Sequence, residues 1–220
     1  QPRSRGLGDV YKRQLKDYAI WVEQTATDRT GMYRLTFTKD SDADILVNLG
    51  GYIASTTMRN AFVKKVSNNE IEGNFDTYGR HWGGPENVKI HFVIRFDKDF
   101  ERLDGWRDKE RYSDIDTLKG SSVITRRHPK EELSYLDSPT SGVSAHYAVK
   151  TGERICVRTA ISYVSVENAR ENLENDAVTW DFDQVRKSSQ DEWNEWLGRI
   201  EVKGGSQEQR TKFYTDLWHV

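Results

Sequence analysis

The sequence contains one cysteine, Cys156, which excludes an internal disulfide and a cysteine-based zinc site. Cys156 stands between Ile155 and Val157, a setting that predicts a small, buried filler in a strand. No run of about 18 apolar residues occurs, so no helix is expected to span a bilayer. The net charge of −2 gives no electrostatic basis for binding nucleic acid or an anionic membrane.

Motifs of several enzyme classes are also missing. There is no Gly-x-Ser-x-Gly nucleophile elbow, no phosphate-binding loop and no dinucleotide fingerprint. The histidines show no spacing typical of metal ligands, and two of them, His91 and His146, fall on the polar faces of expected strands. The five are His81, His91, His128, His146 and His219.

The first fourteen residues read QPRSRGLGDVYKRQ. They are basic and aperiodic and have no apolar core, so they do not form a secretory signal. The string resembles translated adaptor sequence, and we therefore set residues 1–14 apart from the fold. We expect the native N-terminus to be missing.

Successive runs between Tyr18 and Tyr163 alternate apolar and polar residues, a period of two that predicts β-strands. We expect strands over residues 31–37, 43–49, 87–97, 142–150 and 153–164. In the clearest run, Val88, Ile90, Phe92, Ile94 and Phe96 point one way, and Lys89, His91, Arg95 and Asp97 point the other. This pattern predicts a sheet with one face in water, and many strands without interleaved helices predict an antiparallel β-sandwich.

The period changes to about 3.6 after Ser165, which predicts helices. Ser165, Asp181 and Ser206 are expected N-caps, with Gln209 completing a capping box, and Gly198 is expected to end the second helix. A short strand is predicted over Ile200–Val202. The expected apolar helix faces carry Trp193, Trp196, Phe213 and Trp218, which we interpret as packing residues that need a partner domain.

Aromatic residues make up 11% of the chain and suit either a sheet core or sugar recognition. Residues 76–85 and 104–120 are expected to form loops that carry Trp82 and Trp106. In or next to these loops are the carboxylates that a glycoside hydrolase would need in pairs. The candidates are Asp76, Glu86, Asp104, Asp114 and Asp116, for which solvated loop charge is the favoured interpretation. Asp114-Ile-Asp116 lacks the remaining ligands of a calcium loop.

Five blocks of the sequence, in order, resemble segments of one known family. They are TATDRTGMYRLTF at 25–37, ISYVSVENARENL at 161–173, WDFD at 180–183, IEV at 200–202 preceded by Trp193 and Leu197, and FYTDLWH at 213–219. Together they resemble glycoside hydrolase family 92 over roughly residues 18–220. That family consists of calcium-dependent, exo-acting α-mannosidases that invert the anomeric configuration.

The resemblance implies an N-terminal β-sandwich over residues 15–164 and a helical linker over 165–205. Residues 206–220 would begin a truncated (α/α)6 barrel. The family's general acid, base and calcium ligands lie in that barrel, so the resemblance assigns no catalytic, substrate-binding or metal-binding residue to this chain. The chain alone is therefore expected to be inactive and to pack against its own barrel domain. The resemblance also implies mannose-containing glycans as substrates and export from a bacterium, although the chain shows no signal sequence.

Two other functions remain open. The sandwich is a carbohydrate-binding module if Trp82 or Trp106 contacts sugar. It is a structural or interaction domain if its helices only dock another protein.

Overall fold

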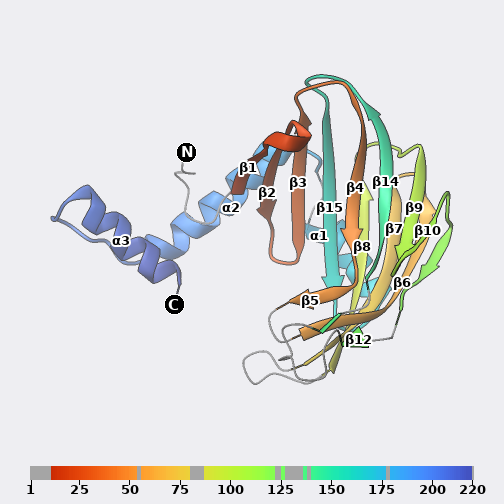
Figure 1. Ribbon diagram of the computed structural model, residues 1–220. Coiled ribbons are helices and arrows are strands. Elements are labelled where there is room, and N and C mark those ends of the chain that lie inside the picture. The colour runs from red at the N-terminus through yellow and green to blue at the C-terminus, as the bar shows by residue number, and fades with distance from the viewer. Residues whose placement is uncertain are drawn as a thin grey trace.

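The computed structural model describes residues 11–53, 56–79, 87–121, 125–126, 136–137, 140–176 and 179–219. Two antiparallel sheets pack face to face, and three helices lie on the side of the larger sheet (Figure 1). The predicted fold class, an antiparallel β-sandwich followed by helices, is confirmed.

The larger sheet has nine strands in the order β1-β2-β3-β15-β8-β7-β6-β11, with β5 also paired to β6. The strands are β1 (Tyr11–Leu15), β2 (Ile20–Ala26), β3 (Thr30–Phe37), β5 (Gly51–Ile53), β6 (Thr56–Ser67), β7 (Glu70–Tyr78), β8 (Asn87–Phe96), β11 (Thr117–Lys119) and β15 (Arg154–Ser162). A 3-10 turn, Lys16–Tyr18, joins β1 to β2. Strand β1 begins inside the segment that the sequence set apart and pairs with β2 from Tyr11 onward.

The smaller sheet has four strands in the order β10-β9-β14-β4. They are β4 (Ser41–Asn48), β9 (Arg102–Arg107), β10 (Glu110–Tyr112) and β14 (Ser141–Val149). Strands β12 (Thr125–Arg126) and β13 (Leu136–Asp137) form a separate pair. Strands β9, β10 and β11 correct the prediction of a loop over residues 104–120. The many charged residues of this segment hid the alternation of its strands, although Leu103 and Leu118 are buried in the core.

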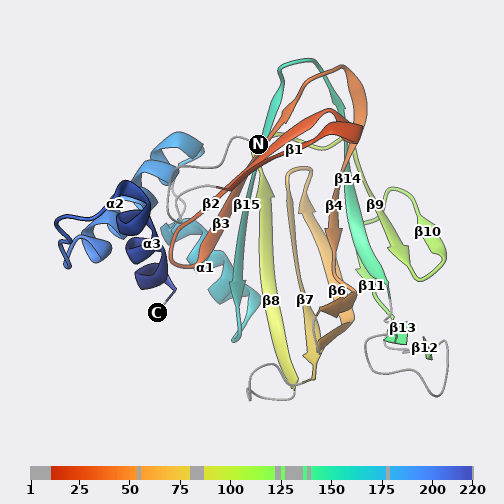
Figure 2. The same cartoon turned by 60° about the vertical axis from the view of Figure 1, so that its left-hand side comes forward.

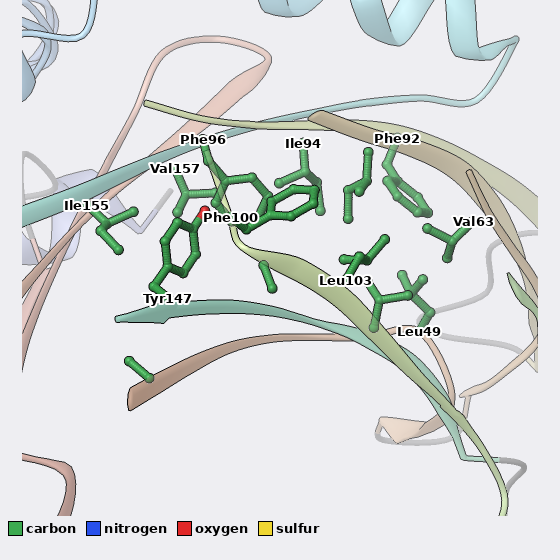
Figure 3. Packing of buried hydrophobic residues seen from close by; sticks show 14 of the residues in the cluster. Leu49, Val63, Phe92, Ile94, Phe96, Phe100, Leu103, Tyr147, Ile155 and Val157 are labelled. Atoms are coloured by element: carbon green, nitrogen blue, oxygen red, sulfur yellow. The ribbon is translucent and has the colours of Figure 1, made fainter. Parts of the chain in front are cut away.

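The core lies between the two sheets, as the alternating runs predict. Phe92, Ile94 and Phe96 of β8 meet Val143, Ala145 and Tyr147 of β14 there. Figure 3 shows Phe96, Phe100 and Tyr147 packed together, and the rings of Phe96 and Phe100 meet edge to face with centroids 5.9 Å apart. Burial of this apolar surface is the main force that holds the sheets together.

Helix α1 (Val166–Asp176) covers the outer face of the nine-stranded sheet beside β8 and β15 (Figure 2). Its Ala169 and Leu173 are fully buried against Val93 and Ala160. The prediction that this face is in water is therefore wrong beside α1, and the buried Val93 within the polar stripe of β8 was the sequence signal for it.

Helix α2 (Phe182–Leu197) starts where the Asp181 side chain accepts a hydrogen bond from the Gln184 amide, and it ends at Gly198. Its first turn packs Phe182 and Val185 on Met32 and Cys156. Burial raises the pKa of the Cys156 thiol to about 11, with the nearby Asp97 charge adding to the shift. Cys156 is thus the small buried filler that the sequence predicted.

Helix α3 (Gln207–Trp218) begins with the predicted Ser206–Gln209 capping box. The prediction of a strand over Ile200–Val202 is wrong. The backbone of this segment forms hydrogen bonds with a side chain and not with another strand. The Tyr214 hydroxyl donates to the carbonyl of Ile200 at 3.0 Å and accepts from the amide of Val202 at 3.3 Å. None of the helices in the described ranges is long and apolar enough to cross a membrane.

Candidate functional site

The five candidate carboxylates do not form one cluster. Asp76 lies on β7, Asp104 lies on β9 of the other sheet, and Asp114 and Asp116 lie between β10 and β11. Glu86 lies outside the described residues, as do Trp82, His81 and His128. Among the residues that the structure describes, no group of three or more His, Cys, Asp or Glu side chains is placed to hold a metal ion.

Asp76 is held as an anion. Its carboxylate accepts a hydrogen bond from Asn60 Nδ2 at 2.9 Å and lies 2.9 Å from Lys89 Nζ. Burial acts to raise the pKa of Asp76, but the contacts with Asn60 and Lys89 outweigh it and the pKa is lowered. A carboxyl group with a lowered pKa is a poor general acid, so Asp76 does not fit the acid role of a glycosidase.

Asp104 fixes a turn. Its Oδ1 accepts hydrogen bonds from the Ser113 hydroxyl and the Asp114 amide, each at 3.0 Å, and its Oδ2 accepts one from Arg102 at 2.9 Å. These contacts hold Asp114 in a left-handed conformation with φ of 51°. Asp104 therefore shapes the connection between β10 and β11.

A groove of about 720 Å³ lies between the β2–β3 turn, α2 and α3. It is lined by Ala26, Thr27 and Asp28 of the turn, by Ser189, Glu192, Trp193, Trp196, Leu197, Arg199 and Ile200 in and after α2, and by Leu217 and Trp218 of α3. The Trp193 and Trp218 rings pack against each other with centroids 5.9 Å apart, as predicted for packing residues. Trp196 is 54% exposed, and the guanidinium of Arg199 lies over its ring, 3.6 Å from the ring centroid.

The β2–β3 turn is fixed by contacts within it and to α1. The Thr27 amide donates to the Thr30 carbonyl at 2.9 Å, and the Thr30 amide donates to Thr27 Oγ1 at 3.1 Å. Arg29 donates to the Asp176 carboxylate from its backbone amide, at 3.0 Å, and from its guanidinium. One wall of the groove is thereby tied to the end of α1.

Arginines on the outer face of the nine-stranded sheet fix the start of α2. Arg34 of β3 donates to Glu23 at 2.7 Å and to Asp183 at 2.8 Å, and its guanidinium lies 4.4 Å from the Phe182 ring centroid. Arg158 of β15 stacks on Trp180 at 3.8 Å. A guanidinium that pairs with carboxylates and stacks on a ring uses both binding modes of arginine.

The groove suits contact with apolar side chains better than covalent chemistry. Its walls are mostly indole and aliphatic surface, and the described carboxylates at its rim, Asp28 and Glu192, come from different elements. The sequence predicted the apolar helix faces that form it. It did not single out Asp28 or Arg34, and the signal available for both was their place in the TATDRTGMYRLTF block.

A sandwich that continues directly into a second, helical segment defines a multidomain protein, and family comparisons match both parts. Residues 8–162 match the model of the glycosyl hydrolase family 92 N-terminal domain, and residues 168–220 match that of the glycosyl hydrolase family 92 catalytic domain. The chain therefore belongs to glycosyl hydrolase family 92. None of the curated proteins matches it significantly.

Solved structures share the fold. The family GH92 α-mannosidase BT3965 of Bacteroides thetaiotaomicron is 24% identical with a TM-score of 0.75, covering 96% of this chain and 26% of that protein. The inverting mannosidase BT2199 of the same organism is 18% identical with a TM-score of 0.74, covering 96% and 25%. The glycosyl hydrolase ccman5 is 22% identical with a TM-score of 0.70, covering 90% and 24%. The chain thus spans about a quarter of the length of these proteins.

Proposed function

We propose that this chain forms the N-terminal sandwich and the beginning of the catalytic domain of an exo-acting α-mannosidase. The substrates would be glycans with terminal α-linked mannose. The observation that carries the proposal is the pair of family models, which match the chain in domain order over residues 8–162 and 168–220. Solved neighbours described as an α-mannosidase and an inverting mannosidase support the same activity.

We propose further that the reaction inverts the anomeric configuration and that the catalytic pair lies outside this chain. Inversion needs an acid and a base about 6.5–9.5 Å apart, with room for a water between them. Asp76 and Asp104 are each engaged in other contacts and lie on different sheets. The 220-residue chain alone is accordingly expected to hydrolyse no mannoside.

Calcium dependence and export belong to the same proposal. Among the described residues no group of three or more His, Cys, Asp or Glu side chains is placed to hold a metal ion, and we propose that the calcium ligands belong to other parts of the longer protein. The family resemblance supports a calcium requirement of the longer protein and its export from the cytoplasm.

Mannose release by the longer protein tests the proposal. We expect the protein that contains this chain together with a complete family 92 catalytic domain to release mannose from α-linked manno-oligosaccharides. We expect chelation by EDTA to stop the release and added calcium to restore it. The 220-residue chain is the matched control and should release none. Absence of mannose release by the longer protein, or turnover by the control, would contradict the proposal.

A further inference from the structure

The outer face of the four-stranded sheet carries a tryptophan. Trp106 of β9 lies opposite Gly142 of β14, and Gly142 lies opposite Asn48 of β4. The neighbours Leu103 and Val143 point into the core, so Trp106 and Gly142 point outward, because alternate residues of a strand face opposite sides. The structure thus moves Trp106 from a predicted loop to a rigid sheet face.

The indole ring of Trp106 lies directly over Gly142. A Cβ atom on Gly142 would be only 2.4 Å from Cζ2 and 2.5 Å from Cη2 of the ring. Glycine therefore leaves the space that lets the indole lie against the sheet. The ring is half-buried, and Leu46, on the same face, is 64% exposed.

Polar groups stand beside this apolar surface. Asp44 Oδ1 accepts a hydrogen bond from the Ser144 hydroxyl at 2.9 Å and lies 3.2 Å from His146 Nδ1. Ser144 is two residues along β14 from Gly142, so it lies about 7 Å away on the same face. The spacing places hydrogen-bonding groups roughly one sugar unit from the indole.

We propose that this sheet face, formed by Trp106, Leu46, Asp44, Ser144 and His146, binds the α-linked mannose units of a glycan. A pyranose ring has an apolar face of C–H groups, which would stack on the indole, and a rim of hydroxyls. The Asp44 carboxylate would accept from those hydroxyls, and the Ser144 hydroxyl and the His146 imidazole would complete the polar contacts. Specific binding sites commonly combine apolar contact with a few placed polar groups in this way.

The face is separate from the helical side of the molecule. Helices α1 and α2 contact strands β2, β3, β8 and β15 of the nine-stranded sheet, whereas the four-stranded sheet lies across the core from them (Figure 1). A glycan bound there would be held without entering the α2–α3 groove. The choice of mannose as the sugar rests on the proposed function.

Titration of the 220-residue chain with α-linked mannotriose tests the proposal, followed by NMR or calorimetry. We expect saturable binding with a Kd on the order of 1 mM, because one indole and a few hydrogen bonds form the contact. Trp106→Ala should weaken binding about tenfold or more, and Trp106→Phe should weaken it less. Asp44→Asn and Ser144→Ala should each weaken it several-fold. Trp196→Ala removes an exposed indole from the groove and should leave the affinity unchanged.

Circular dichroism and thermal unfolding would establish that each variant is folded. If Trp106→Ala does not fold, the Asp44 and Ser144 variants still decide the test. Binding that is absent, or equal for the wild type and the Trp106 and Asp44 variants, would overturn the proposal. Equal affinity for β-linked glucose oligomers would overturn the choice of mannose. Self-association of the chain that is lost on Leu46→Ser would assign the face to a second copy. The titration measures binding and not turnover. A longer protein that releases no mannose would therefore contradict the proposed function without deciding whether this sheet face binds mannosides.

Discussion

At the scale of the residue, Arg34 links the TATDRTGMYRLTF block to the helices. Its side chain is 13% exposed and joins Glu23, which is 11% exposed, to Asp183 at the start of α2. Burial acts to raise the pKa of Glu23, but contacts with Arg34 and Lys12 outweigh it and the pKa is lowered. The pKa of Asp183 is also lowered, chiefly by the hydrogen bond from Arg34. Arg34 is thus a point at which strand and helix stabilise each other.

Replacing Arg34 tests that link. We expect Arg34→Met to lower the free energy of unfolding at pH 7 by about 2 kcal/mol, because it removes the buried partner of the Glu23 carboxylate and leaves that carboxylate with the more exposed Lys12 side chain. Urea denaturation measures this loss. Lys187→Met is the control, since Lys187 and its partner Asp191 on α2 are 64% and 58% exposed and such a pair contributes at most about 1 kcal/mol. Equal losses for the two variants would contradict the account.

The same pair has a pH signature. A lowered folded-state pKa means that the ionised carboxylate favours the folded state, so its stabilisation is complete above the carboxyl pKa of the unfolded chain. It is lost as the pH falls through the folded-state pKa. We expect the difference in stability between the wild type and Glu23→Gln to be largest near pH 7 and to shrink towards pH 3. A difference that grows on acidification would contradict the expectation that ionised Glu23 stabilises the folded state.

At the scale of the element, the sequence predicted what periodicity and capping encode. Strands β3, β8, β14 and β15 were expected within a few residues of their bounds, and so were the caps at Ser165, Asp181 and Ser206. Both signals are local, because alternation and a cap depend on neighbours in sequence. The β9–β11 region was missed because its strands are short and bear charge on their solvent side.

Long-range contacts account for the other differences. Helix α1 covers one face of the sheet, and its position there depends on where the chain turns after β15. In the sequence, the apolar Val93 within a polar stripe was the signal for this cover. Residues 200–202 have strand composition but no strand partner, since Tyr214, twelve residues on from Val202, takes their backbone hydrogen bonds. For the site, the sequence predicted the apolar helix faces, while the positions of the five carboxylates depend on sheet pairing that composition does not encode.

Tyr214 offers a test at this scale. Tyr214→Phe removes the hydroxyl that bridges Ile200 and Val202, which is worth about 1 kcal/mol. We expect faster amide hydrogen exchange at Val202 and through α3, with the sandwich strands unchanged. Tyr163→Phe is the matched control, because the Tyr163 side chain is 69% exposed on the surface. Unchanged exchange at Val202 would show that the hydroxyl does not hold the connection.

At the scale of the whole molecule, the chain combines a packed sandwich with helices that keep apolar surface exposed. Trp196, Ile200, Phe213 and Trp218 are each at least 36% exposed around or near the groove. Family 92 models match both the sandwich and the helical segment, and the solved relatives are about four times longer than this chain. We infer that the sandwich and its arginine contacts position α2 and α3 for a catalytic domain that holds the reacting groups.

The most direct test of that inference is the anomer of mannose first released by the longer protein. A proton NMR time course on an α-linked mannoside, with calcium present, reports both turnover and stereochemistry. We expect β-mannose to appear first and then to equilibrate with the α anomer, because an inverting acid and base act in a single displacement. Release of α-mannose first, or no release of mannose, would contradict it.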